Sequence, residues 1–459
     1  MLRLITIYLA LTAALFTPSV FAHSTSTNYK TAYKYTVRYI PRYQTGVAQM
    51  IATENPGLNI LISPIGMGPE YKAVVAINDD TIYTSTILDL TNEPQVLTLP
   101  SYSNTYSIQQ VDVFGTVLNT NILPNSDGVT YELVGPNYTG SAPTGVTQIK
   151  VPQNVTILAV RTDKYSNNDG VYTDVITAAN DFSASVQLQS LSAWQENPIG
   201  GATTMEPLSY FSPSTKTMVD NTIQNTTEVF FEAMQFIMDM PSTSPLSKSD
   251  EALIAKFNRL YDSAKQDKAS REFTDLIEGA RAGHEAVLAR WRSHTIGHNW
   301  VHFNNMGNWG NQFLDRAAGN EYLQYGNIKT EAYYAQAFKD NDKHSLTGKN
   351  NKTYTITFAK HKIPTSTRFW SLTAYTPSDI ELVENSANKY VVASYSPDLV
   401  TNSDGSITIY LSKVAPADSA KLPNWLPIPS TEFSVMLRVY GPTGNIKAGG
   451  YIPPFVKSN

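Results

Sequence analysis

Short runs in which apolar and polar residues alternate are concentrated in two parts of the chain. In the first part the alternation predicts strands at residues 95–99, 106–118, 129–134, 147–151 and 155–161, preceded by a looser alternation over 76–90. Turns rich in Pro, Gly, Asn and Asp separate these runs, and no helical pattern lies between them. This spacing is typical of an antiparallel β-sandwich or barrel.

A second group of strands is predicted near the C-terminus, at residues 353–358, 369–375, 390–394, 407–411 and 433–440. Three segments stand out here: Arg368–Tyr375, Asn424–Pro427 and Met436–Pro442. They place five large side chains on or beside strands that have one buried face: Trp370, Tyr375, Trp425, Arg438 and Tyr440.

Elsewhere the apolar residues recur at helical spacing. Helices are expected at residues 29–54 (one or two short ones), 171–182, 185–194, 225–240, from Ser247 onward, and 271–291. Asn225 and Glu228 have the spacing of a capping pair at the start of their helix. Helices with one apolar side must pack against each other or against a sheet, so the middle of the chain is predicted to be a helical insert.

Composition narrows the classes of protein that fit this pattern. A chain of 459 residues suggests two or three domains, and 42% hydrophobic residues are enough for a large interior. The net charge of -5, without any run of Lys or Arg, argues against a nucleic-acid partner. The absence of cysteine excludes disulfides, thiol catalysis and cysteine-rich zinc sites.

The first residues have the pattern of a secretory signal peptide. Arg3 supplies a short basic region, Leu4–Phe16 is almost wholly apolar, and Val20 and Ala22 are the small residues of a cleavage site. We therefore expect residues 1–22 to be removed and the mature protein to be secreted or periplasmic. No later run is long and uncharged enough to span a bilayer, so no stable membrane span is expected after cleavage.

An ordered series of short elements resembles a known pair of domains. Asn78–Tyr83, Leu88–Leu90, Leu133–Pro136 and Leu158–Thr162 follow the order found in DUF1254 domains, and the segments from Gly307 to Tyr375 are similar to the DUF1214 domain that usually follows. The resemblance implies a mainly β fold with α: two antiparallel β-sandwich domains, the second jelly-roll-like, plus a helical insert. The expected divisions are 1–22 signal peptide, 23–65 N-terminal arm and short helices, 66–196 DUF1254-like sandwich, 197–345 helical region and 346–459 DUF1214-like domain.

A site is expected where the two predicted domains meet. Asp79, Asp80 and Tyr83 from the first, with Arg438 from the second, are the candidate catalytic residues, because adjacent carboxylates can bind a hard cation or act as acid and base. The alternative roles of the two aspartates are to cap the turn and to pair with Arg161 or Arg438. The candidate ligand-binding residues are Arg161, Asn308, Arg316, Trp370, Tyr375 and Trp425, although both tryptophans also fit a role in the core.

Three histidines spaced by four, His294, His298 and His302, suggest a metal site on a continuous helix. Gly297 and the polar residues after it predict a helix break, and no Glu lies between His298 and His302 as in metalloproteases. No metal site is therefore predicted, and no cofactor can be named.

Three functions remain open at the level of sequence. The leading interpretation is an extracytoplasmic protein that recognises a polar small molecule or glycan in an interdomain cleft. One alternative is a hydrolase, with or without metal assistance, that uses Asp79 and Asp80. The other is a structural protein that assembles through its jelly-roll-like domains, and the sequence is compatible with a homo-oligomer. No nucleophile motif, phosphate loop or dinucleotide fingerprint is present, so the sequence does not decide whether the protein is an enzyme.

Overall fold

The structure is a computed structural model that describes residues 25–54, 57–63, 68–72, 74–199, 214–240 and 246–459. The predicted signal peptide, residues 1–22, lies outside the described residues, so the signal peptide remains a prediction. Within the described ranges, no helix combines the length and the apolar character needed to cross a membrane.

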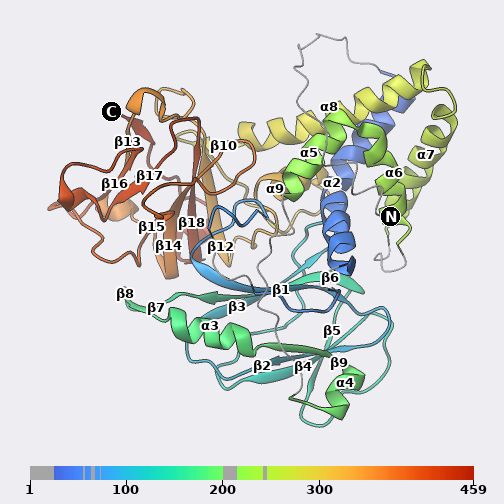
Figure 1. Ribbon diagram of the computed structural model, residues 1–459, viewed down its shortest axis with the longest axis horizontal. Helices are drawn as coiled ribbons and strands as arrows, with labels where there is room; N and C mark the ends of the chain where they lie inside the picture. The colour runs from blue at the N-terminus through green and yellow to red at the C-terminus, as the bar shows by residue number, and fades with distance from the viewer. Residues whose placement is uncertain (1–24, 55–56, 64–67, 73, 200–213, 241–245) are drawn as a thin grey trace.

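The first β-sandwich, in the lower half of Figure 1, consists of two sheets around one apolar core. One sheet has the order β1-β6-β3, with β1 at Thr81–Asp89, β6 at Val155–Asp163 and β3 at Tyr106–Asp112. The other has the order β5-β4-β2-β9, with strands at Thr147–Lys150, Val129–Val134, Gln95–Leu99 and Gln187–Ser190. Apolar side chains from both sheets, such as Leu88 and Leu97, are fully buried between them.

The second β-sandwich pairs a six-stranded sheet with a four-stranded sheet. The six-stranded sheet has the order β10-β11-β12-β18-β14-β15, with strands at Thr295–Gly297, Trp300–Val301, Ala332–Ala337, Ser434–Pro442, Ser366–Tyr375 and Val391–Ala393. The four-stranded sheet has the order β17-β16-β13-β19, with strands at Trp425–Pro427, Ile407–Ser412, Tyr354–Phe358 and Lys457–Ser458. Within the two sandwiches, β4 pairs with β5 and β16 with β17 in parallel, and the other neighbouring strands are antiparallel.

The six-stranded sheet is buried on both faces, which the sequence did not predict. Along β18, Leu437 and Val439 belong to the core of the second sandwich, whereas Met436 and Tyr440 belong to the core shared with the helices. Successive side chains of a strand point to opposite faces, so Arg438 lies on the same face as Met436 and Tyr440. This second face is covered by the first sandwich and the helical region, and it carries the polar residues described below.

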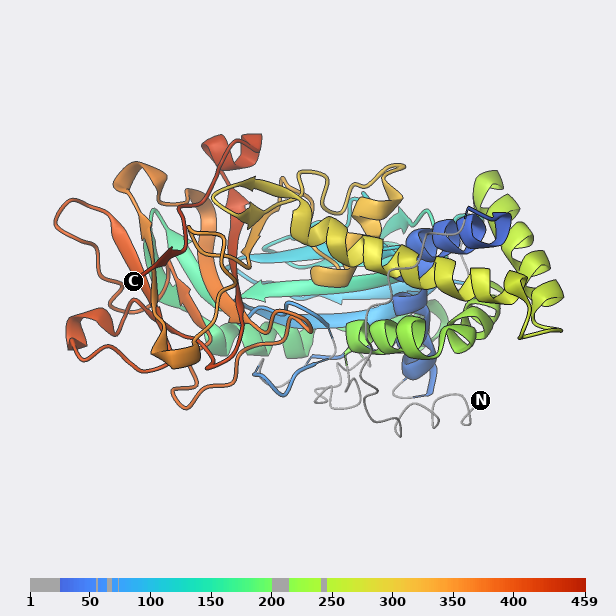
Figure 2. The same cartoon turned by 90° about the horizontal axis from the view of Figure 1, so that it is seen from above.

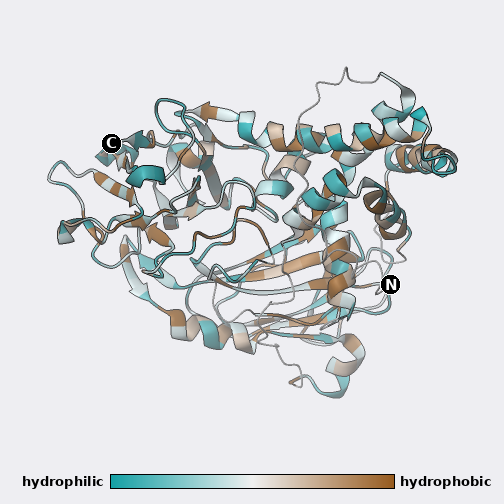
Figure 3. Ribbon diagram, turned by 45° about the horizontal axis from the view of Figure 1, so that its top comes forward, coloured by the Kyte–Doolittle hydropathy of each residue, from teal (hydrophilic) through white to brown (hydrophobic). Residues whose placement is uncertain are grey.

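The helical region packs around one long N-terminal helix. Its main helices are α2 (Thr27–Glu54), α5 (Thr215–Asn225), α6 (Thr227–Met238), α7 (Lys248–Ala264), α8 (Arg271–Ser293) and α9 (Phe313–Tyr322). Helices α2 and α8 lie side by side, as Figure 2 shows, and hydrophobic and hydrophilic bands alternate along α8 in Figure 3. Short helices complete the structure: α3 (Ile176–Ser185), α4 (Leu191–Glu196), α10 (Gly444–Ala448), η2 (Lys349–Asn351), η3 (Lys360–Lys362) and η4 (Ser419–Lys421). The remaining strands, β7 (Tyr165–Asn168) and β8 (Val171–Asp174), form a hairpin.

Most of the predicted elements are confirmed, and the mainly β fold with helices is confirmed as well. The strands predicted at 95–99 and 129–134 have the bounds of β2 and β4, and Ser247 caps α7 by accepting a hydrogen bond from the Asp250 amide. The jelly-roll topology of the second domain and the proposed domain divisions remain predictions. The six-stranded sheet takes β10, β11 and β12 from the stretch that we assigned to the helical region.

Four helix predictions were wrong in part. Most of residues 185–194 form strand β9 and the start of the six-residue helix α4, because pairing with β2 overrides a weak local helix preference. The stretch 171–182 begins as strand β8 and becomes helical only at Ile176. Asn225 does not cap α6, because it is the last residue of α5. The region 29–54 forms one long helix that contains Pro41, and burial of side chains such as Tyr35 and Tyr39 along this helix offsets the hydrogen bond that Pro41 cannot make.

Candidate functional site

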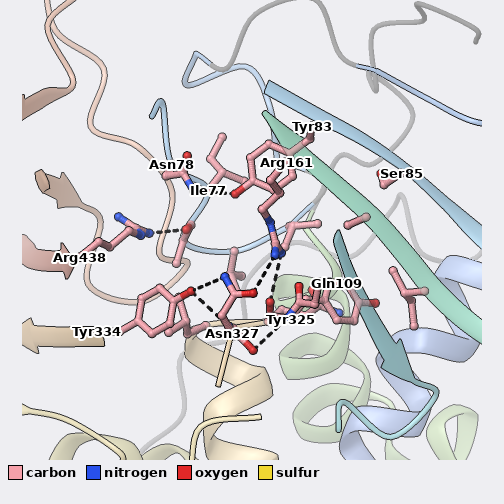
Figure 4. Close-up of a pocket in the computed structure, with 18 of the residues that line it drawn as sticks. Ile77, Asn78, Tyr83, Ser85, Gln109, Arg161, Tyr325, Asn327, Tyr334 and Arg438 are labelled. Atoms are coloured by element: carbon pink, nitrogen blue, oxygen red, sulfur yellow. Dashed lines mark hydrogen bonds between the residues drawn. The ribbon is translucent and has the colours of Figure 1, made fainter. Parts of the chain in front are cut away.

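A cavity of about 100 Å³ lies where the two sandwiches and the helical region meet. Figure 4 shows that its lining comes from segments far apart in the chain. Strands β1, β3 and β6 contribute from the first sandwich, β12 and β18 from the second, and the segment after α9 closes one side. The loop before β1 also borders the cavity, so the site exists only in the assembled fold.

Strand registers explain why these side chains converge. Tyr83 on β1 lies opposite Arg161 on β6, and Gln109 on β3 lies opposite Ala159. On the other side, Tyr334 on β12 lies opposite Arg438 on β18. Directly opposed residues of antiparallel strands project from the same face, so each sheet presents a small polar patch to the cavity.

Arg161 is held by neutral partners. Its guanidinium donates to Asn327 Oδ1 at 3.2 Å and to the carbonyl oxygen of Tyr325 at 3.2 Å, and its Cζ lies 5.2 Å from the centroid of the Tyr83 ring. The residue is only 7% exposed. Among the described residues it forms no ion pair with a carboxylate.

Arg438 is the second cation of the cavity and is almost completely buried. Its Nη2 donates to the carbonyl oxygen of Ala76, whereas its Nη1 makes no hydrogen bond of good geometry with any described residue. Burial by itself lowers the pKa of Arg438, but the nearby phenols of Tyr375 and Tyr440 and the carboxyl of Asp80 raise it above its usual value. The guanidinium therefore carries its charge at neutral pH.

Asn78 joins the two sandwiches at the edge of the cavity. Its Oδ1 accepts hydrogen bonds from the amides of Asp80 and Thr81, at 3.0 and 3.1 Å, and so shapes the turn that starts β1. Its Nδ2 donates to the hydroxyl of Tyr83 at 2.6 Å and to that of Tyr440 at 2.7 Å. One amide thus connects a phenol of the first domain to a phenol of the second.

The two candidate aspartates have different environments. Asp79 is partly exposed and pairs with the Lys164 ammonium at 2.6 Å. Asp80 is fully buried and accepts hydrogen bonds from the Ser371 hydroxyl, at 2.8 Å, and from the Tyr395 hydroxyl. Burial raises the pKa of Asp80, although Arg438 and the two hydroxyls partly oppose the rise. Neither aspartate lines the cavity.

Of the ten candidate residues, the structure brings Tyr83, Arg161 and Arg438 together around the cavity. The others do not line it. Trp370 and Trp425 are buried in the second sandwich, Tyr375 donates to the carbonyl oxygen of Ile77 behind the cavity wall, Arg316 donates to the carbonyl oxygen of Arg38, and Asn308 is exposed.

Sequence reasoning missed four residues of the cavity lining that form its hydrogen-bond network: Asn78, Asn327, Tyr334 and Tyr440. Asn78 and Tyr440 belong to segments that the sequence singled out, and turn capping by the side chain of Asn78 was the available signal. No local pattern marks Asn327 or Tyr334, because their roles depend on contacts with Arg161 and with each other.

The histidines do not form a site on one helix. Helix α8 ends at Ser293, and His298 adopts a positive φ of 51° in the turn that follows. The Nδ1 of His302 lies 2.7 Å from the carbonyl oxygen of Tyr334.

A different trio, Asp220, His284 and Glu321, brings potential metal ligands within 4.8 Å of one another in the helical region. The ammonium of Lys216 lies 2.6 Å from Asp220 and 3.1 Å from Glu321, so it already occupies the position of a cation.

The fold and the cavity define a class of protein: two β-sandwiches joined by a helical region, with a cavity at their junction that combines apolar walls with convergent polar side chains. The family models described as "Protein of unknown function (DUF1254)" and "Protein of unknown function (DUF1214)" match residues 59–202 and 331–444, respectively. The chain therefore belongs to the two-domain DUF1254/DUF1214 family.

One solved structure supports the fold. The VPA0106 protein from Vibrio parahaemolyticus is similar over 94% of this chain and 100% of its own, with a TM-score of 0.58 and 19% sequence identity. An uncharacterized protein from Burkholderia cenocepacia is similar over 94% of each chain, with a TM-score of 0.44 and 13% identity. Among curated proteins, none matches the sequence.

Proposed function

We propose that this protein binds a small polar molecule in the cavity between its two sandwiches. The observation that carries the proposal is the cavity itself, which is lined by hydrogen-bonding side chains from both domains. Pockets at domain junctions that combine apolar walls with a few convergent polar groups are the usual places for small ligands. The apolar walls here include Val75, Ile77 and Ile157.

The volume favours a small molecule over a glycan. An engineered protein cavity of about 150 Å³ holds one benzene molecule. A cavity of about 100 Å³ therefore accommodates a molecule of only a few heavy atoms and leaves no room for an oligosaccharide.

The two alternatives from the sequence have weaker support. A hydrolase would need Asp79 and Asp80 to face one substrate, whereas they bond to Lys164 and to Ser371 and Tyr395.

The test is to fill the cavity. Ser85 lines it, so Ser85→Leu should occupy the space, whereas Ser166→Leu places the same side chain on strand β7 of the hairpin, outside the lining. A panel of small polar molecules is screened by thermal denaturation of the purified protein. We expect hits that raise the Tm of the wild type and of Ser166→Leu but not of Ser85→Leu. Hits that stabilise Ser85→Leu equally would place binding elsewhere and reject the proposal.

A further inference from the structure

We infer that the ligand of this cavity is a small carboxylate, held by Arg161 and Arg438. This inference rests on the proposed function and names the chemical class of the ligand. It follows from an imbalance among the described residues that line the cavity: the two charged side chains are both cationic, and none of the lining residues carries a carboxylate.

Among the described residues, no carboxylate forms an ion pair with Arg161. Buried charges in proteins are normally paired, because an ion removed from water loses several kcal/mol of hydration that only an opposite charge or strong hydrogen bonds can replace. Within the part of the chain that the structure describes, the partners of Arg161 are neutral: the amide of Asn327, the carbonyl of Tyr325 and the face of the Tyr83 ring. An anion in the cavity would provide the missing charge.

Arg438 also has a hydrogen-bond donor that no described residue uses in good geometry. The carboxyl group of Asp80 interacts electrostatically with Arg438, but its oxygens accept hydrogen bonds from the hydroxyls of Ser371 and Tyr395. Its buried Nη1 makes no hydrogen bond of good geometry among the described residues, and the residue lines the cavity. A guanidinium nitrogen in this state is a donor available to a ligand.

Three tyrosine hydroxyl groups supply further hydrogen-bond donors to the cavity. The hydroxyls of Tyr83 and Tyr440 accept from Asn78 Nδ2, and the hydroxyl of Tyr334 accepts from the backbone amide of Asn327 at 3.1 Å and from its Nδ2 at 3.0 Å. In the described structure none of these three hydroxyls is seen to donate a hydrogen bond. Burial raises the pKa of Tyr334 and of Tyr440, so both keep their protons at neutral pH.

The donor and acceptor roles in these hydrogen bonds follow from the other partners of Asn327 and Asn78. Asn327 Oδ1 accepts from Arg161, so its Nδ2 must be the group that donates to Tyr334. Asn78 Oδ1 accepts from two backbone amides, so its Nδ2 must face the phenols. Both chains of bonds therefore end in hydroxyl protons at the cavity. Two guanidinium groups and three phenols match an acceptor-only ligand with negative charge, and the planar carboxylate is the smallest organic group of that type.

The experiment compares molecules of one shape and different charge. Binding of propionate, propionamide and inorganic phosphate to the purified full-length protein is measured by titration calorimetry near pH 7 at low ionic strength. We expect propionate to bind and propionamide to bind at least about tenfold more weakly, because charge-assisted hydrogen bonds are lost. Arg161→Gln should weaken propionate binding by about tenfold or more, and Tyr334→Phe should also weaken it.

Arg281→Gln is the matched control. Arg281 is a half-buried arginine with a neutral partner, the Thr227 hydroxyl at 3.2 Å, and it lies outside the cavity lining. Its replacement should leave propionate binding unchanged, and circular dichroism should show that every variant is folded.

The other outcomes separate the inference from the proposed function. Equal binding of propionamide and propionate, blocked by Ser85→Leu, would reject the anionic ligand and keep the cavity as a binding site. Binding of phosphate without propionate would reject the carboxylate in favour of an inorganic oxyanion. Propionate binding that survives both Ser85→Leu and Arg161→Gln would reject the cavity as its site, and the absence of binding by all three probes would reject the carboxylate inference alone.

Discussion

The sequence identified Asp80 as a candidate residue, but contacts with residues far away in the chain decide its role. The sequence placed it in a turn next to Asp79, with a choice between chemistry and turn structure. In the fold it is fully buried against Ser371 and Tyr395, residues of the other domain. Its carboxyl therefore ties the turn before β1 to the six-stranded sheet, behind the cavity rather than in it. The turn itself is shaped by Asn78, which no charge-based reading would select.

The pH dependence of stability tests this placement. The pKa of Asp80 is raised in the folded protein by burial, so the folded state binds the proton more tightly than the unfolded state. Its contribution to stability is complete below the unfolded pKa, near about 4, and is lost as the pH rises through the folded pKa. We expect the difference in unfolding free energy between the wild type and Asp80→Asn to become less favourable to the wild type as the pH rises from 4.5. Urea titrations at several pH values measure it, and a difference that grows with pH would contradict the buried placement.

At the scale of elements, the contact between α2 and α8 organises the helical region. Gly279 and Gly283 of α8 face the backbone of α2, and a Cβ at Gly279 would lie 2.3 Å from the carbonyl oxygen of Tyr29. Local periodicity predicted α8 almost to its ends, since its buried face is continuous. The same reasoning failed for β9, because a four-residue strand has too few positions for its period to outweigh pairing with β2.

For Gly279→Ala, helix propensity and helix packing predict opposite changes in stability. Alanine is better than glycine in a helix by about 1 kcal/mol. At Gly279, however, the added methyl must push the two backbones apart, which typically costs about 1–3 kcal/mol. We expect a net loss of stability in urea unfolding. The control is Ala289→Gly at an exposed position of the same helix, which should cost about 1 kcal/mol through propensity alone. A stabilised Gly279→Ala variant would mean that the helices do not approach so closely.

For the whole molecule, a buried ion pair fixes the two sandwiches to each other. Arg368 on β14 donates from Nε to Asp163 Oδ2 at 2.9 Å and from Nη2 to Oδ1, so the pair is bidentate and crosses the domain junction. The hairpin β7-β8 adds a hydrogen bond from Asn167 to the carbonyl oxygen of Arg368 at 2.8 Å. These contacts hold the walls of the cavity in place.

A double-mutant cycle measures this connection. Arg368→Met leaves the carboxylate of Asp163 buried without its partner, which should cost about 3–5 kcal/mol in unfolding free energy. Asp163→Asn combined with Arg368→Met removes both charges and should cost less than Arg368→Met alone. Urea unfolding of the two single variants and the double variant gives the coupling energy. Additive losses would show that the pair does not join the domains.

The sequence by itself determined most of the local structure, that the fold is mainly β, and which family the chain resembles. It also led us to expect a junction of the two domains that involves Asp80 and Tyr375. The hydrogen bonds of Asp80 to Ser371 and of Tyr375 to the carbonyl oxygen of Ile77 cross that junction.

Only the tertiary structure decided the cavity. Alternation along a strand fixes which side chains share a face, but not what covers that face. The six-stranded sheet is covered on both sides, so Arg438 and Tyr334 became buried polar groups facing Arg161 and Tyr83 from another sheet. Charge, hydrogen-bond direction and volume of the site arise from these distant contacts, which no local period encodes.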